Sequence, residues 1–283
     1  MLTSQFTERP TDQHCGLRNA LLSANSVLPA PSVRFPETVA GFMGTGVERL
    51  LDDLQKHGLS IVQLDAPLQG PVFRHLGSLL GEAIPELDPA VQPYVEDGVV
   101  LNLVADAGVT GDIHLQPFGT TPLSLHSEGS GRCIADQPRY IVLMCVEPGD
   151  DDSAQTVLIP MVSVAAGLSP DDLRLLGHTR YDSAHNVPTI ARASSSRTVF
   201  SFRDFQGTPL QWACEAEDAE PEAVNQALRR LLAQMYDRRH AHGVTWTRGL
   251  LIVMDNTRFF HGRTAGPVRM VHQPRHLKRL RIR

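Results

Sequence analysis

Apolar residues recur at two spacings along the chain, and the spacing changes from one segment to the next. In residues 221–243, Val224, Leu228 and Leu231 recur every three or four positions, so they share one face of a helix. A proline at the start and Gly243 at the end are typical helix boundaries. By the same criteria the sequence predicts helices at residues 46–58, 71–84, 221–243 and, after a capping Ser169, in a short segment that follows it.

Shorter apolar runs predict β-strands between these helices. The runs occupy residues 59–65, 98–106, 122–126, 140–147, 154–160, 196–204, 244–247, 249–256 and 275–283. Residues 1–45 show weak periodicity and scattered prolines, which predicts an irregular N-terminal arm. Because there is no repeat and no low-complexity linker, the pattern favours one α+β domain over residues 1–283, built around a β-sandwich or barrel.

Composition limits the classes of partner. The chain has 283 residues, 42% of them hydrophobic, a formal net charge of −5 and a pI of about 6.2. This balance does not indicate nucleic acid or an anionic membrane as the main partner. The four cysteines form no CxxC pair, and the N-terminus has neither a basic region nor an apolar run. We therefore expect reduced thiols and a soluble, cytoplasmic protein that binds a small molecule.

One predicted strand ends in residues whose side chains are able to bind a metal. His126 and Glu128 are separated by a single residue, and on a strand this spacing puts both side chains on the same face. A third ligand must come from elsewhere, and the best candidate is His261, which follows an apolar strand and an Asp-Asn turn. Two histidines and one carboxylate form the facial triad of non-haem Fe(II) oxygenases. With 12 histidines in the chain, however, a lone His-x-Glu is also common by chance.

A second signal lies near the C-terminus. Arg275 and Arg279 follow His261 on the last apolar strand, and a guanidinium holds a carboxylate with two parallel hydrogen bonds. An Fe(II) oxygenase that uses 2-oxoglutarate needs such a group at the far end of this cosubstrate. The alternative is a solvated basic tail, since Arg281 and Arg283 lie on the same face of the strand.

Together these segments resemble a known family. The motifs LHSEGS, QPRYIVLMCVEPG, AQT, DNTRFFHGRT and RHLKR occur in this order between about residue 98 and residue 283. Their order and spacing are similar to those of the Fe(II)/2-oxoglutarate-dependent oxygenases related to clavaminate synthase and taurine dioxygenase. The family fold is a double-stranded β-helix, or jelly roll, with helices packed outside. Ser127 stands where many relatives have threonine.

The resemblance implies a role for each matching residue. The implied iron ligands are His126, Glu128 and His261. Arg275 would bind the distal carboxylate of 2-oxoglutarate, with a hydrogen bond from the hydroxyl of Thr156, and Arg279 would bind a carboxylate of the prime substrate. Fe(II), 2-oxoglutarate and dioxygen are the implied cofactor and cosubstrates.

We therefore expect hydroxylation of an unactivated C–H bond in a small metabolite derived from an amino acid, free or carrier-bound, in secondary metabolism. Desaturation or cyclisation with the same cofactors is the alternative. Two further classes are a zinc metallohydrolase and a non-catalytic metal-binding β-sandwich protein. Some polar residues could contact the substrate, although each is equally consistent with a turn or loop. They are Gln116, Ser130, Arg132, Asp182 and Asn186. The aromatic residues Tyr181, Phe202 and Trp212 are more typical of a core.

Overall fold

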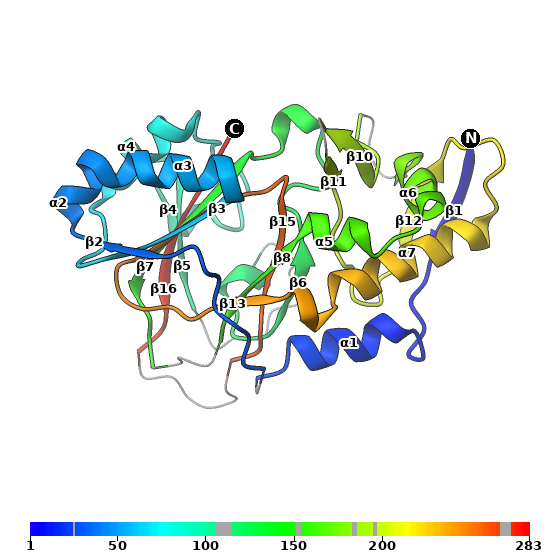
Figure 1. Ribbon diagram of the computed structural model, residues 1–283, viewed down its shortest axis with the longest axis horizontal. Coiled ribbons are helices and arrows are strands. Elements are labelled where there is room, and N and C mark those ends of the chain that lie inside the picture. The colour runs from blue at the N-terminus through cyan, green and yellow to red at the C-terminus, as the bar shows by residue number, and fades with distance from the viewer. Residues whose placement is uncertain (25, 106–114, 151–153, 183–185, 195–196, 267–272) are drawn as a thin grey trace.

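The computed structural model describes residues 1–24, 26–105, 115–150, 154–182, 186–194, 197–266 and 273–283 (Figure 1). Its largest element is a seven-stranded sheet, antiparallel except for its first pair. In spatial order the strands are β2 (Phe35–Glu37), β3 (Leu59–Leu64), β14 (Leu250–Asp255), β7 (Tyr140–Glu147), β16 (His276–Ile282), β5 (Val100–Val104) and β4 (Val95–Glu96).

A four-stranded antiparallel sheet lies opposite this large sheet. Its strands are β13 (His242–Val244), β8 (Thr156–Pro160), β15 (Phe259–Arg263) and β6 (Leu123–His126). Side chains from both sheets, such as Ile252 of β14 and Leu158 of β8, pack together in one buried cluster between them. The two facing sheets form the double-stranded β-helix that the sequence predicts, so the predicted fold class is confirmed.

The outer face of the large sheet is covered by two helices (Figure 1). These are α3 (Val47–His57) and α4 (Gly70–Leu80). Leu251 and Val253 of β14 pack against this helical layer, while Ile252 points into the space between the sheets. Because both faces of β14 are buried, its sequence is a continuous apolar run rather than an alternating pattern.

The outer face of the small sheet carries a second layer, on the other side of the molecule in Figure 1. Its helices are α5 (Met161–Ala166), α6 (Pro170–Gly177) and α7 (Pro221–Met235). Two small sheets complete it, made of β1 (Leu2–Phe6), β12 (Leu210–Cys214) and β9 (Thr179–Tyr181), and of β10 (Ala191–Ser194) and β11 (Arg197–Phe200). Ser169 caps α6 through a reciprocal hydrogen-bonded box with Asp172, as its sequence predicts.

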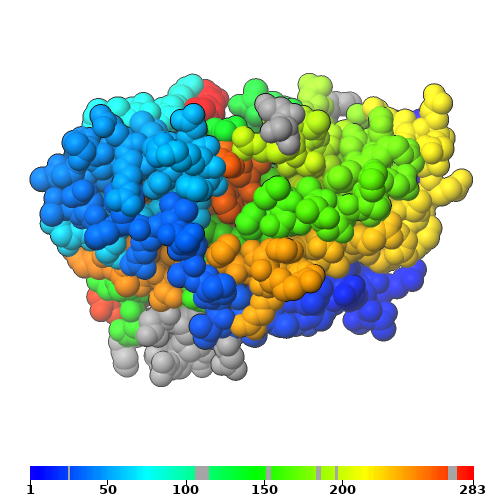
Figure 2. All heavy atoms as spheres, viewed as in Figure 1, coloured from blue at the N-terminus to red at the C-terminus, as the bar shows by residue number. Residues whose placement is uncertain are grey.

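Two predictions of local structure are wrong. The N-terminal 45 residues are not irregular: they contain β1, α1 (Gln13–Leu21), β2, α2 (Val39–Gly41) and most of a π-helical turn, Phe42–Gly46. Their order comes from long-range contacts, since β1 pairs with β12 and α1 lies along α7 (Figures 1 and 2). Helix α7 ends at Met235 rather than Gly243, because residues 242–244 pair with β8 as a strand.

The other predicted helices and strands are present with shifted ends, although the predicted strand 244–247 overlaps β13 only at Val244. The sequence did not predict α5, β4, β9, β10, β12 or β15. The last residue of the predicted strand 98–106 and the first of 196–204 lie outside the described residues. Short 3₁₀ segments occur at Gln92–Tyr94, Gln116–Phe118, Ile134–Asp136 and Arg238–His240. All four cysteines are free thiols, and no helix in the described ranges has the length and apolar character to cross a membrane.

A buried polar network supports β6 from behind. The Tyr236 hydroxyl donates to Asp204 Oδ2 at 2.6 Å and accepts from the backbone N–H of Leu125 at 3.1 Å. Asp204 also accepts from Arg18 Nε at 2.6 Å. Tyr236 therefore ties α7 to the strand that ends at His126, and burial together with the Asp204 carboxylate raises the pKa of its hydroxyl well above the usual range.

Replacing Tyr236 with phenylalanine should lower the free energy of unfolding by about 1–3 kcal/mol. The change leaves the buried Leu125 N–H without its partner and removes one of the donors to Asp204, which keeps Arg18, and an unmade buried hydrogen bond costs that much. Urea denaturation followed by circular dichroism would measure it. The exposed Tyr94 provides the control: Tyr94→Phe should leave the midpoint unchanged. Equal midpoints for Tyr236→Phe and the parent protein would contradict the structural role of this network.

Candidate active site

Two histidines from neighbouring strands face each other in the space between the sheets. His126 is the last residue of β6, and its cross-strand partner on β15 is His261. Their ring centroids are 4.3 Å apart. His126 Nδ1 donates to the backbone carbonyl of Ser124 at 2.8 Å, so its Nε2 carries the lone pair that is able to bind a metal.

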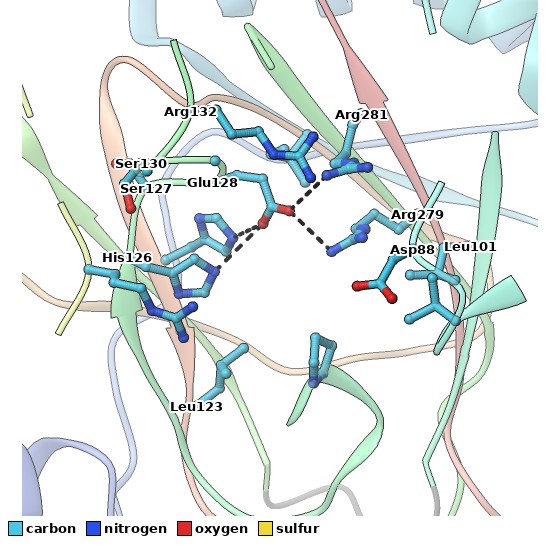
Figure 3. A pocket seen from close by; sticks show the side chains of 18 of the residues that line it. Asp88, Leu101, Leu123, His126, Ser127, Glu128, Ser130, Arg132, Arg279 and Arg281 are labelled. Atoms are coloured by element: carbon cyan, nitrogen blue, oxygen red, sulfur yellow. Dashed lines mark hydrogen bonds and ion pairs between the residues drawn. The ribbon is translucent and has the colours of Figure 1, made fainter. Parts of the chain in front are cut away.

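Glu128 completes a compact group of ligand atoms. Its Oε2 lies 3.7 Å from His126 Nε2 and 3.8 Å from His261 Nε2 (Figure 3). One ligand atom from each of the three residues lies within 4.8 Å of the other two. Burial lowers the pKa of His261 to about 3, with a further contribution from the neighbouring His126, so its imidazole is neutral and suited to coordinate a cation. This donor set fits a divalent metal of the Fe(II) or Zn(II) type.

Glu128 reaches this position by a route that differs from the predicted one. The strand does not deliver both ligands, because β6 ends at His126 and Glu128 lies in the turn that follows. The backbone of Glu128 is instead fixed by Asn256, whose Oδ1 accepts from its N–H at 2.7 Å and whose Nδ2 donates to its carbonyl at 3.0 Å. Gly129 then takes a left-handed conformation, with φ of 71°, which turns the chain away.

Asn256 is therefore a residue whose role sequence reasoning missed. Its amide also donates to the carbonyl of Pro138 at 2.9 Å, so that it joins three separate segments. The available signal was its place directly after β14 and shortly before His261, where only a turn was predicted. A buried asparagine that hydrogen-bonds several backbone groups stabilises the structure more than an asparagine that only forms a turn.

Positive charge surrounds the carboxylate of Glu128. Burial alone would favour its neutral form, but the positive charge of Arg279, with a further contribution from Arg281, outweighs burial and holds the pKa of Glu128 well below its usual range. Arg279 and Arg281 each place a terminal nitrogen near Glu128 Oε1, at 3.5 and 3.6 Å. Glu86 balances these two arginines, with one oxygen 3.0 Å from Arg279 and the other 2.8 Å from Arg281. The acid of the triad is thus kept ionised and available to a metal.

The side-chain alternation of β16 creates this charged wall. Leu280 and Ile282 point outward, into the apolar layer under α3 and α4, whereas Arg279 and Arg281 line the cavity. The predicted shared face of the C-terminal arginines is therefore present, and it is not a solvated tail. Arg275 also lines the cavity and is buried.

The cavity has a volume of about 940 Å³, and the three candidate ligands line it. Its wall also contains Thr156 of the small sheet and Arg275, together with the apolar side chains of Leu101, Leu103 and Leu143. Thr156 Oγ1 accepts from Trp246 Nε1 at 3.1 Å, which leaves the hydroxyl proton of Thr156 to donate to another acceptor.

The other predicted polar residues divide into two groups. Ser130 and Arg132 line the cavity, as does Tyr181, which the sequence favoured as a core residue. Asp182 and Asn186 are exposed and do not line it, and the carbonyl of Gln116 accepts from Arg263 at 3.1 Å. Phe202 and Trp212 belong to the core behind the small sheet, as predicted.

A second cluster of potential ligands is a different kind of site. Glu8, His14 and Cys15 lie close together, but Glu8 is paired with Arg18 through both carboxylate oxygens. Burial, with the charge of Glu8, raises the pKa of the Cys15 thiol to about 11, which disfavours the thiolate that binds metals. This group is an ion-pair network that anchors α1.

Comparison with known proteins gives one family. The family model described as "Taurine catabolism dioxygenase TauD, TfdA family" matches residues 36–281. No curated protein matches the sequence. Among solved structures, an asparagine oxygenase in complex with Fe(II), 2S,3S-3-hydroxyasparagine and succinate superposes with a TM-score of 0.64 at 18% identity, over 84% of this chain and 79% of that chain.

Two further structures have the same fold. The PvcB protein from Pseudomonas aeruginosa has a TM-score of 0.61 at 22% identity, with 91% of this chain and 90% of that chain covered. The non-heme iron oxygenase OrfP, in complex with Fe, succinate and (3S)-hydroxy-L-Arg, has a TM-score of 0.60 at 17% identity, with 84% and 80% covered. At these identities the likeness establishes the architecture around the site.

Replacing Asn256 with alanine should weaken binding of a divalent metal by about ten- to a hundredfold, because the turn that presents Glu128 loses its anchor. Calorimetric titration with Mn(II) under nitrogen would measure this affinity. Asn19→Ala, in the exposed part of α1, is the matched control and should bind as the parent does. Unchanged Mn(II) affinity in a folded Asn256→Ala protein would show that the asparagine does not position a ligand.

Proposed function

The chain belongs to the TauD/TfdA family of dioxygenases, and from this premise we propose that it hydroxylates an unactivated C–H bond of a small substrate derived from an amino acid. The predicted family, enzyme class and use of Fe(II), 2-oxoglutarate and dioxygen are confirmed by the family match. The observation that carries the proposal is the convergence of His126, Glu128 and His261 at a cavity that Arg275 also lines.

In this proposal the three converging residues are the metal ligands. His126 and His261 would each offer an imidazole nitrogen, and Glu128 an ionised carboxylate, and the cavity would give room for a cosubstrate beside the metal. Bound Fe(II) supplies the oxidising chemistry there, with 2-oxoglutarate and dioxygen as its cosubstrates. The chain itself holds the ligands in place, through Asn256 for Glu128 and the Ser124 carbonyl for His126.

The end of the cavity between the sheets would hold 2-oxoglutarate. Arg275 would pair with its distal carboxylate, and Thr156, whose oxygen already accepts from Trp246, would donate its hydroxyl proton to the same group. Leu101, Leu103 and Leu143 would pack against its methylene carbons and exclude water from that end.

The other end would hold the prime substrate. Arg279 would bind a carboxylate of this substrate beside the metal, where Glu86 already orients the guanidinium. An amino-acid-derived substrate is favoured because two proteins of the same fold were solved with hydroxylated asparagine and hydroxylated arginine. A free acid suits Arg279 better than a carrier thioester, which has no carboxylate at that carbon.

The direct test is a screen of free amino acids and their derivatives for substrate-stimulated succinate formation under air, with Fe(II), 2-oxoglutarate and ascorbate. At least one compound should raise succinate above the background of the enzyme alone. Mass spectrometry with labelled dioxygen should then find one labelled oxygen in the product. Loss of two hydrogens instead would favour desaturation or cyclisation.

Other results would contradict the proposal. A zinc metallohydrolase would hydrolyse its substrate with Zn(II) and without dioxygen, and a non-catalytic metal-binding protein would bind Fe(II) but form no succinate with any compound. Metal identity after purification does not separate these classes, since Zn(II) outcompetes Fe(II) for such ligands.

Replacement of Arg275, which precedes β16, and of Arg279, which lies in β16, should change different kinetic constants. Arg275→Leu should raise the KM for 2-oxoglutarate by roughly ten- to a thousandfold, the usual effect of losing one bidentate charged contact. Arg279→Leu should raise the KM for the prime substrate instead. The exposed Arg239→Leu is the control and should change neither constant. The reversed pattern would mean that the two roles are exchanged.

A further inference from the structure

The cavity is rich in arginine although the chain as a whole is acidic. Most of these guanidinium groups have an internal partner. Arg279 and Arg281 share the two oxygens of Glu86, and Arg283 is paired with Glu82 at 2.7 Å. Arg263 donates to backbone carbonyls of the segment around Pro117. Each of these arginines therefore has a partner within the protein, in addition to any contact with a substrate.

Arg203 differs from them. It lines the cavity, and its backbone forms an isolated antiparallel bridge with His126, which places it next to a proposed metal ligand. Arg203 is half-buried, and its Nε is buried without a hydrogen-bond partner, as are those of Arg279 and Arg281. Unlike the guanidiniums of Arg279 and Arg281, which pair with Glu86, its guanidinium makes no hydrogen bond or ion pair with another described residue. The guanidinium carbon lies 5.9 Å from the ring centroid of Phe205, which also lines the cavity.

A half-buried cation in this position favours an anion as its partner. Even partial burial of a charged group is unfavourable unless the charge is paired, and one aromatic contact offsets only a part of that cost. The protein holds Arg203 in place through its backbone, since its N–H donates to the Tyr181 hydroxyl at 3.0 Å. The planar guanidinium of Arg203 presents N–H donors that match a carboxylate in geometry as well as in charge.

We propose that Arg203 binds a second carboxylate of the prime substrate, so that the substrate class is a dicarboxylate such as an acidic amino acid. This inference rests on the function proposed above. The backbone of Arg203 is bridged to that of His126, whereas the guanidinium of Arg279 lies 3.5 Å from Glu128, so the two arginines are attached beside different proposed ligands. A substrate held at both acids would span the metal and present the carbons between them for oxidation.

Arg132 is the competing candidate for this second anion. It also lines the cavity and has no ion-pair partner within the described ranges, and Figure 3 places it above Glu128, on the side of Arg281. However, Arg132 is exposed, so water already solvates its charge and an anion gains less by binding there. Arg203 is half-buried and its Nε is shielded from water, so its charge is less well solvated than that of Arg132, which favours Arg203.

The test compares acids with their amides in the full-length, Fe(II)-loaded protein. Stimulated succinate formation is measured with aspartate against asparagine, glutamate against glutamine, and the N-acetyl form of each. The acid of at least one pair should have a kcat/KM about ten- to a thousandfold above that of its amide, as expected for one charged contact. In Arg203→Gln this ratio should fall towards one, mainly through a higher KM for the acid.

Two variants make the assignment specific. Arg203→Lys retains the charge and should keep part of the preference for the acid, which separates recognition from damage to the fold. Arg132→Gln, the matched change at the exposed arginine of the cavity, should leave the ratio of acid to amide as in the parent. Circular dichroism verifies that each protein is folded.

Several results would overturn the assignment. These are a parent enzyme that prefers an amide or a neutral side chain, no stimulation by any diacid, a ratio that Arg203→Gln leaves unchanged, or a ratio that only Arg132→Gln lowers. Stimulation by neutral compounds alone would refute the second carboxylate but keep the proposed oxygenase. Absence of succinate with every compound, and in the enzyme alone, would refute the oxygenase itself.

Discussion

The pairing of β6 with β15 is the constraint on which the site depends. It sets His126 directly opposite His261, on the inner face of the small sheet. The register between these strands shifts by one residue towards Leu123, and this irregularity lets both Leu123 and His126 face the cavity although an odd number of positions separates them. Without it, one of the two side chains would point into the apolar layer behind the sheet.

Charge balance is the second level of organisation. Glu128 faces two guanidiniums, and Glu86 neutralises part of their charge without competing for the metal position. The network keeps the acid ionised in a buried place, where an isolated carboxyl would tend to be protonated. The same strand that supplies the arginines also anchors itself in the core through its alternate residues, so the charged wall rests on a rigid element.

The sequence predicted the parts of this arrangement that follow from local pattern or from short motifs. Strands such as β7 and helix α3 agree with their predicted ranges because their apolar spacing is regular and their ends carry turn signals. The three residues at the proposed metal site were found from their types and from the family resemblance. Whether these residues lie close together depends on the register between paired strands, and the sequence of one strand alone does not specify that register.

What sequence reasoning missed depends on contacts between distant segments. Asn256 accepts a hydrogen bond from the backbone N–H of Glu128, a residue far from it in the sequence. Likewise, β1 is a strand only because β12 pairs with it. Arg203 was not considered, because its strand-like segment carried no motif and its significance lies in the lack of an internal counter-charge among the described residues. Such features require the positions of several elements at once.

The central claim, that His126, Glu128 and His261 together hold one catalytic metal, is tested most directly by anaerobic equilibrium binding of Fe(II). The parent protein should bind one ion per chain. His126→Ala, Glu128→Ala and His261→Ala should each weaken this binding by roughly a hundredfold or more, since each removes one of three protein ligands. Any of the three variants that is folded and binds Fe(II) as tightly as the parent would contradict the account.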